Sequence, residues 1–208
     1  MPKIKQPFEA LKNYIPEGSY DTLMEYILHY RVKLTVTRKR QSILGDYRHP
    51  HKNDGHRISI NENLNPYAFL ITLLHELAHL LTYEQYGNRV KSHGAEWKRA
   101  YAKILHEFMQ LEIFPAPIYR ALEQSIKNPA ASSCSDEVLL RVLRHYDKRP
   151  QSQVLVEQLQ QGDRFVISQN RIFEMVGKAR TRYKCKEVET GKMYLFSAMY
   201  EVKILQQM

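Results

Sequence analysis

The chain of 208 residues is 43% hydrophobic and 25% charged, a balance that excludes disorder throughout and allows one well-buried domain with a small appendage. Its 31 basic and 22 acidic residues give a net charge of +9, which favours a polyanionic partner such as nucleic acid. The longest apolar stretch, Ala68 to Leu74, is too short to cross a bilayer, and the N-terminus lacks an apolar leader, so we expect a soluble cytoplasmic protein without membrane contact.

The first part of the chain predicts helical structure followed by three strands. Apolar residues recur at helical spacing from Tyr20 to Arg31, after a weaker helical stretch over residues 8–14. The pattern then alternates with period two, and this predicts strands at Val32 to Thr37, Ser42 to Tyr47 and Arg57 to Asn61.

A long apolar helix follows these strands. Asn65 is expected to cap it, Pro66 suits its first position, and Gly87 is expected to end it. Nearly every face of this helix is apolar, so we expect it to be buried. The next helix, about Ala95 to Gln110, carries one apolar stripe that includes Trp97, which we expect to pack in the core rather than to bind a ligand.

The rest of the chain changes from helices to short strands. We predict a short helix at residues 118–126, a linker at 128–135, and a helix at 136–146 capped by Ser135. Five strands then predict a small barrel or a strongly bent sheet; they are Arg164 to Ser168, Ile172 to Val176, Arg182 to Val188, Met193 to Phe196 and Tyr200 to Leu205.

These elements predict an α+β chain in three parts. A compact domain is expected over residues 1–127, a linker with a helix over 128–160, and a small β-module over 161–208. Cys134 and Cys185 lie far apart in the sequence and show no CxxC spacing, so we expect both to be free thiols.

The long helix carries the motif that predicts chemistry, His75-Glu76-Leu77-Ala78-His79. Residues four apart share one helix face, so both imidazoles can bind one zinc ion. Zinc lowers the pKa of a bound water toward about 7, and Glu76 is placed to take that proton as general base. The alternative is a chance match, but two histidines and a glutamate inside an apolar helix would incur a desolvation cost that a metal offsets. The motif therefore predicts a zinc-dependent metallopeptidase.

Zinc needs a third protein ligand, and two residues near the start of the next helix compete for this position. His93 precedes Gly94, which permits close approach of the backbone, and a helix–loop–helix return can bring His93 beside the motif histidines. Glu96 is the rival, because a glutamate one helix downstream completes another zincin pattern. Spacing favours His93 and leaves Glu96 open.

The run Leu-Leu-His-Glu-Leu-Ala-His-Leu-Leu, followed by His-Gly-Ala-Glu-Trp, resembles SprT-like proteins, a family that includes Spartan, which degrades proteins crosslinked to DNA. The resemblance covers about residues 20–111 and includes the short strands before the motif helix. It implies a zincin-like domain, one zinc ion held by His75, His79 and His93, catalysis by Glu76, and a protein substrate on or near DNA. Many members also carry a four-cysteine zinc ribbon; this chain keeps only Cys185 in the corresponding segment, so we expect no second zinc.

Several other features have competing interpretations. The basic runs predict a DNA-binding surface, with a solvated charged face as the alternative; their residues are Arg38, Lys39, Arg40, Lys178, Arg180, Arg182 and Lys184. The segment from Arg57 to Asn61 is a hypothetical sheet edge that pairs with an extended substrate, against an ordinary core strand. A histidine group in the loop before it predicts structural or surface roles rather than a second metal site; its members are His49, His51 and His56.

Two other functions stay open beside peptide hydrolysis. One is a zinc-stabilised nucleic-acid-binding or regulatory protein without catalysis, although an intact Glu76 speaks against it because a structural zinc needs no general base. The other is metal-assisted hydrolysis of a non-peptide bond.

Overall fold

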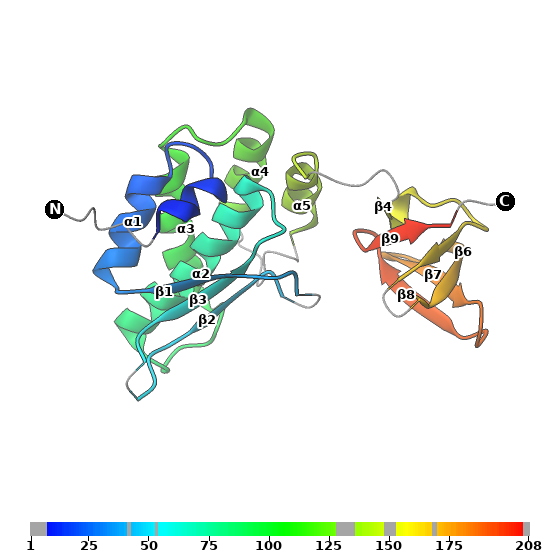
Figure 1. Cartoon of the computed structure of the whole chain (residues 1–208), viewed down its shortest axis with the longest axis horizontal. Helices are drawn as coiled ribbons and strands as arrows, with labels where there is room; N and C mark the ends of the chain where they lie inside the picture. The colour runs from blue at the N-terminus through cyan, green and yellow to red at the C-terminus, as the bar shows by residue number, and fades with distance from the viewer. Residues whose placement is uncertain are drawn as a thin grey trace. The chain divides into compact units, whose positions relative to one another are not determined.

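The computed structural model describes residues 8–40, 43–52, 54–127, 136–147, 153–167 and 170–205. The chain divides into two compact units, Met1–Asp147 and Lys148–Met208 (Figure 1). The structure is of mixed α+β class, as predicted, with a three-stranded sheet in the first unit and a six-stranded sheet in the second. Among the described residues, no helix has both the length and the apolar character needed to cross a membrane.

The first unit follows the predicted order of elements. It contains η1 (Glu9–Asn13), α1 (Tyr20–His29), β1 (Lys33–Thr37), β2 (Gly45–Arg48), β3 (Arg57–Asn61), α2 (Pro66–Tyr86), α3 (Ala95–Met109), α4 (Ala116–Lys127) and α5 (Glu137–Arg144). The helix α4 begins earlier than predicted, because Pro117 fits within the first helical turn, where its missing N–H leaves no hydrogen bond unmade.

The sheet of the first unit has the order β1-β3-β2, with β3 parallel to β1 and antiparallel to β2. The hypothesis that Arg57–Asn61 forms the sheet edge was wrong. This strand pairs on both sides and buries Ile58 and Ile60, as a central strand does. The two edge strands are β1 and β2, and β2 lies against α2.

Helix α2 forms the centre of the first unit, as its apolar faces predicted. The sheet packs on one side of it and α3 along another (Figure 1). The side chain of Asn65 accepts a hydrogen bond of 3.0 Å from the Ala68 N–H, and Gly87 ends the helix at a positive φ of 60°. Trp97 is fully buried on α3, which confirms its predicted packing role.

Helix α5 belongs to the first unit. Leu139 and Leu143 are buried in the same core as α2, and the Asn65 side chain donates to the Leu143 carbonyl at 2.9 Å. The first unit therefore extends to Asp147, whereas the sequence suggested a boundary at residue 127. The predicted linker at 128–135, with Ser135 and Cys134, lies outside the described residues; Asp136 caps α5 through the Leu139 N–H.

The second unit is one antiparallel sheet of order β4-β9-β5-β6-β7-β8 around an aromatic core of Phe165, Phe173 and Phe196. Its elements are β4 (Gln153–Leu155), η2 (Val156–Gln158), β5 (Arg164–Val166), β6 (Ile172–Lys178), β7 (Arg182–Glu187), β8 (Met193–Ser197) and β9 (Glu201–Ile204). The five predicted strands are present. The strand β4 was missed because three residues show no usable alternation. Cys185 is a buried free thiol, as expected.

Candidate metal centre

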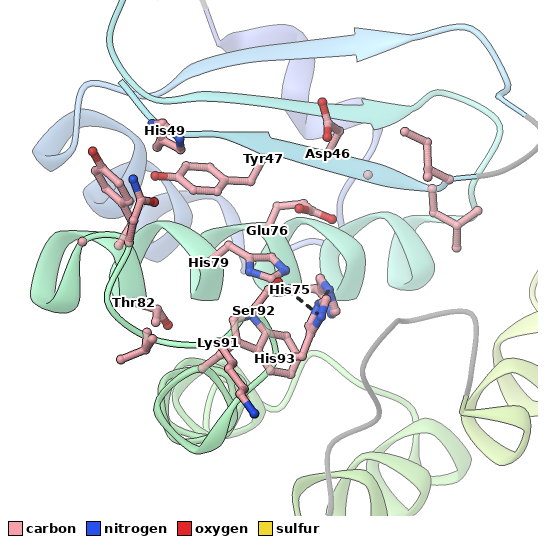
Figure 2. A pocket seen from close by; sticks show the side chains of 18 residues that line it. Asp46, Tyr47, His49, His75, Glu76, His79, Thr82, Lys91, Ser92 and His93 are labelled. Carbon is pink, nitrogen blue, oxygen red and sulfur yellow. Dashed lines mark hydrogen bonds between the residues drawn. The ribbon is translucent and has the colours of Figure 1, made fainter. Parts of the chain in front are cut away.

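Three histidines from two successive elements converge beside α2 (Figure 2). His75 and His79 stand one turn apart on α2, with His75 buried and His79 half-buried. His93 lies in the loop just before α3, and its Nε2 is 3.2 Å from the Nε2 of His75. One ring nitrogen from each of the three histidines lies within 4.8 Å of the others. The rival Glu96 is not part of this group; it forms an ion pair of 3.7 Å with Arg99.

The backbone turns sharply to aim His93 at the other two rings. His93 has a positive φ of 58°, a conformation that costs a non-glycine residue about 1 kcal/mol. The Gly94 N–H donates to the Lys91 carbonyl at 2.9 Å and closes the turn. A Cβ on Gly94 would lie 2.9 Å from that carbonyl oxygen, so a larger residue would open the turn. The conformation of His93 is therefore locally unfavourable and is held by the turn around it.

The geometry and charge state of the three rings fit a zinc ion. Nitrogens that bind zinc at about 2.0–2.1 Å in a tetrahedral site stand about 3.3 Å apart, close to the 3.2 Å between His75 and His93. Burial lowers the pKa of His75 to about 3 and of His79 to about 4, and the neighbouring histidines add to both shifts. Neutral imidazole is the form that ligates a metal, so the protein presents these rings ready to bind.

Trp97 forms the apolar floor of this centre. Its ring centroid lies 4.6 Å from the centroids of His75 and His93 and 5.3 Å from that of His79. Tyr101 stacks on Trp97 in turn, with 5.1 Å between the two centroids. A large aromatic layer beside three imidazoles limits the access of water to them and restricts their ring planes.

Glu76 lines the same cleft and is held by the edge strand β2. The backbone N–H of Tyr47 donates a hydrogen bond to its carboxylate. A Cβ on Gly45 would lie 2.7 Å from Glu76 Oε1, so only glycine allows this approach of β2. Burial raises the pKa of Glu76 to about 8, Asp46 adds to the rise, and Arg40 and the Tyr47 N–H oppose it. A divalent cation beside the carboxyl would lower this pKa again.

The cleft over the three histidines has a volume of about 510 Å³. The segment from Ile43 to Tyr47 and the loop between α2 and α3 both line it. Asp46 and Tyr47 lie on one side of the histidines and Lys91 on the other (Figure 2). His49 stacks on Tyr83 at 4.8 Å between centroids at one end. The lining of the cleft includes every residue from Ile43 to Tyr47, so one side of the cleft follows β2.

A sequence model of the SprT-like family matches residues 8–117, more than half of the chain. The chain belongs to the SprT-like family. A search of curated proteins gave no match, and neither did a search of solved structures. SprT-like domains are zinc-associated and metallopeptidase-like, which agrees with a three-histidine group beside a buried glutamate.

The loop histidines of this SprT-like protein have separate roles. His56 is buried and lies between the Tyr47 hydroxyl and Glu84, at 2.9 and 3.1 Å. His49 stacks at the end of the cleft, and His51 is exposed in a turn. These positions agree with structural or surface roles, and among the described residues the three form no metal-ligating group.

Part of the predicted DNA surface needs correction. Arg40 donates hydrogen bonds to the Asn61 side chain at 2.8 Å, to the Ser59 hydroxyl at 2.9 Å and to the Ser59 carbonyl at 3.1 Å. Its guanidinium therefore fixes the segment after β1 to β3 and has a structural role. Its place in a basic run did not reveal these partners, because they lie on a strand that follows in the sequence.

The sequence also missed four residues around Glu76. Gly45 and Tyr47 contact it from β2, while His56 and Glu84 contact Tyr47. The period-two alternation of β2 could have placed Gly45 and Tyr47 on one face. Nothing local indicated that this face meets α2.

Proposed function

We propose that this SprT-like protein is a zinc-dependent endopeptidase in which His75, His79 and His93 hold one zinc ion and Glu76 is the general base. The observation that carries the proposal is the 3.2 Å approach of two ring nitrogens from separate elements, beside a buried glutamate in one cleft. Three histidines leave one position of a tetrahedral ion for solvent or substrate, as in catalytic rather than structural zinc sites.

The chemistry divides between the metal and the chain. A bound zinc ion lowers the pKa of water toward about 7 and polarises a carbonyl group. The Glu76 carboxylate accepts a proton from the water that attacks the peptide carbonyl carbon, and it then donates this proton to the leaving amine nitrogen. The Tyr47 N–H, which donates to the carboxylate, orients it for both steps.

The edge strand β2 is the proposed platform for an extended substrate. It pairs with β3 on one side only, and its residues Gly45, Asp46 and Tyr47 line the cleft. An extended peptide can add to such an edge through backbone hydrogen bonds, which depend little on side-chain identity. We therefore propose unfolded or locally opened proteins as substrates, and β2 replaces Arg57–Asn61 in this role.

A Glu76→Gln variant tests the catalytic assignment. We expect it to retain one zinc per chain, because the ligands are unchanged, and to lose cleavage of an unfolded protein such as reduced casein by at least about a hundredfold. A Tyr26→Phe variant serves as control, since it removes a hydrogen bond to Glu107 away from the cleft. Equal cleavage by wild type and Glu76→Gln would refute the mechanism.

DNA is the proposed partner of the second unit, which would direct proteolysis to proteins on DNA. Alternate residues of β7 place Arg182, Lys184 and Lys186 on its exposed face, while Cys185 and Glu187 point inward. Lys178 and Arg180, just before β7, are also exposed. A row of cations on a rigid strand suits phosphate contacts. Arg38 and Lys39 remain part of the proposed surface in the first unit.

Charge reversal in this row tests the DNA proposal. A Lys184→Glu variant should bind duplex DNA more weakly and with a smaller salt dependence, by about one unit of slope for each phosphate that the variant no longer binds. Lys203→Glu, an exposed lysine on β9 of the same unit, makes a matched control. Equal losses of affinity in both proteins would show that net charge acts rather than this row.

A further inference from the structure

A chain of three polar side chains joins the edge strand β2 to the motif helix α2. The Tyr47 hydroxyl lies 2.9 Å from His56 Nδ1, and His56 Nε2 lies 3.1 Å from Glu84 Oε1. His56 is only 7% exposed, so these two contacts satisfy its ring nitrogens where water has little access. Glu84 lies on α2 about two turns after Glu76, so the chain ends on the helix that also carries the proposed general base.

The donors and acceptors of this chain define one arrangement. A Glu84 carboxylate can only accept, so His56 Nε2 carries the hydrogen. In the neutral ring, Nδ1 then accepts from the Tyr47 hydroxyl. Burial raises the pKa of Tyr47, with Tyr83 and Glu84 adding to the rise, so this hydroxyl keeps its proton and is able to donate it to a neutral His56. Each group orients the next one, and the Tyr47 side chain is held at its hydroxyl group.

The backbone and the ring of Tyr47 lie next to two proposed active-site residues, Glu76 and His79. Its backbone N–H donates to the Glu76 carboxylate, and its ring lies parallel to that of His79, at an angle of 2° and 6.4 Å between centroids. Gly45, two residues earlier on the same strand face, contacts Glu76 as well. A shift of Tyr47 would therefore move both groups that hold Glu76.

We propose that Glu84 and His56 act through Tyr47 as positioning residues. They hold β2 in the position relative to α2 in which its backbone orients Glu76 for proton transfer. The proposal rests on the proposed peptidase function. None of the three side chains needs to touch substrate; the effect passes through the backbone of β2. Contacts that only stabilise the fold would change the free energy of unfolding alone, whereas a positioning chain also lowers kcat while the zinc content stays constant.

Two variants and two controls separate these cases. Tyr47→Phe removes only the hydroxyl, and Glu84→Leu removes the acceptor for His56. Tyr26→Phe removes a comparable phenol–carboxylate hydrogen bond between α1 and α3, and Glu84→Gln keeps an acceptor oxygen on the helix. We expect kcat on casein to fall about ten- to a hundredfold in the first two proteins, and to stay within about threefold of wild type in the controls.

The double variant tests whether the residues act as one chain. Tyr47→Phe/Glu84→Leu should lose no more kcat than the stronger single variant, because either change breaks the same chain. Multiplicative losses, or a Tyr47→Phe enzyme as active as Tyr26→Phe, would overturn the proposal. Loss of kcat that follows loss of zinc in proportion would overturn it as well.

Hydrogen exchange gives a readout that does not depend on peptidase activity. Amide protons of β2 (Gly45–Arg48) should exchange about two- to tenfold faster in Tyr47→Phe and Glu84→Leu than in wild type or Tyr26→Phe. If β2 loosens as expected but wild type cleaves nothing in a Glu76-dependent manner, the peptidase proposal fails and the structural link stands. Unchanged exchange of β2 would refute the link itself.

Discussion

Replacement of Gly45 by alanine tests how closely β2 controls Glu76. The new Cβ would stand 2.7 Å from Glu76 Oε1 and 2.8 Å from Thr72 Cγ2, whereas ordinary contacts begin at 3.4 Å. One of the groups must therefore move by roughly 0.7 Å, taken as 3.4 minus 2.7. Gly45 has no positive φ, so the effect comes from this contact and not from backbone strain.

The expected cost follows from that displacement. Crowding of this kind lowers the free energy of unfolding by about 1–3 kcal/mol. A reacting group that is misplaced by about 1 Å can lose about a hundredfold in rate, so we expect kcat to fall about ten- to a hundredfold. Zinc content should stay at one ion per chain, because the three atoms nearest to the new Cβ belong to Glu76 and Thr72 and not to the three histidines.

The assay compares Gly45→Ala with Gly177→Ala. Gly177 lies in β6 of the second unit and has no positive φ, and a Cβ added there would meet no atom within 4 Å, so its replacement should leave casein cleavage unchanged. Steady-state kcat and KM, zinc content and urea unfolding are measured for both, with the kinetics taken well below the unfolding transition. A Gly45→Ala enzyme with wild-type kcat would show that the approach of β2 does not position Glu76.

Three further outcomes follow from the structure. His93 has a positive φ of 58°, so the free energy of unfolding of His93→Gly should exceed that of His93→Ala by about 1 kcal/mol when both are compared without metal. Equal stability of the two variants would contradict the left-handed conformation at this position. Trp97, the single tryptophan, contacts all three histidines, so zinc titration should change its emission up to one equivalent, and His93→Ala should abolish that change; a flat titration of wild type argues against the site. Burial raises the pKa of Cys185 from 9.0 to about 11, so the native thiol holds its proton more tightly than the unfolded one. The free energy of unfolding should therefore fall as pH rises from 9 to 11. Alkylation of this thiol at pH 9 should also be slower in native than in urea-unfolded protein.

Local signals in the sequence predicted α2 and its motif well. The Asn65 cap, the apolar run and the Gly87 stop each act within one or two helical turns, and the structure reproduces all three. The spacing of His75 and His79 is likewise a property of one helix. The packing of Trp97 followed from the apolar stripe of α3.

The features that the sequence did not predict depend on contacts between distant segments. Strand alternation shows that β3 has a buried face, but the order of strands in a sheet is set by pairing, and here β3 became the central strand between β1 and β2. The structural role of Arg40 and the docking of α5 through Leu143 have the same origin. The left-handed turn at His93 could not be read from residue type, because most histidines do not adopt it, although histidine does so more often than most other residues.

X-ray absorption at the zinc edge tests the three-histidine zinc site most directly, since it counts the atoms around the metal. For zinc-loaded protein we predict one ion per chain with three imidazole nitrogens and one further light atom at about 2.0–2.1 Å, and loss of tight binding in His93→Ala. Failure of the purified protein to bind zinc, or an unchanged spectrum in His93→Ala, would contradict this site.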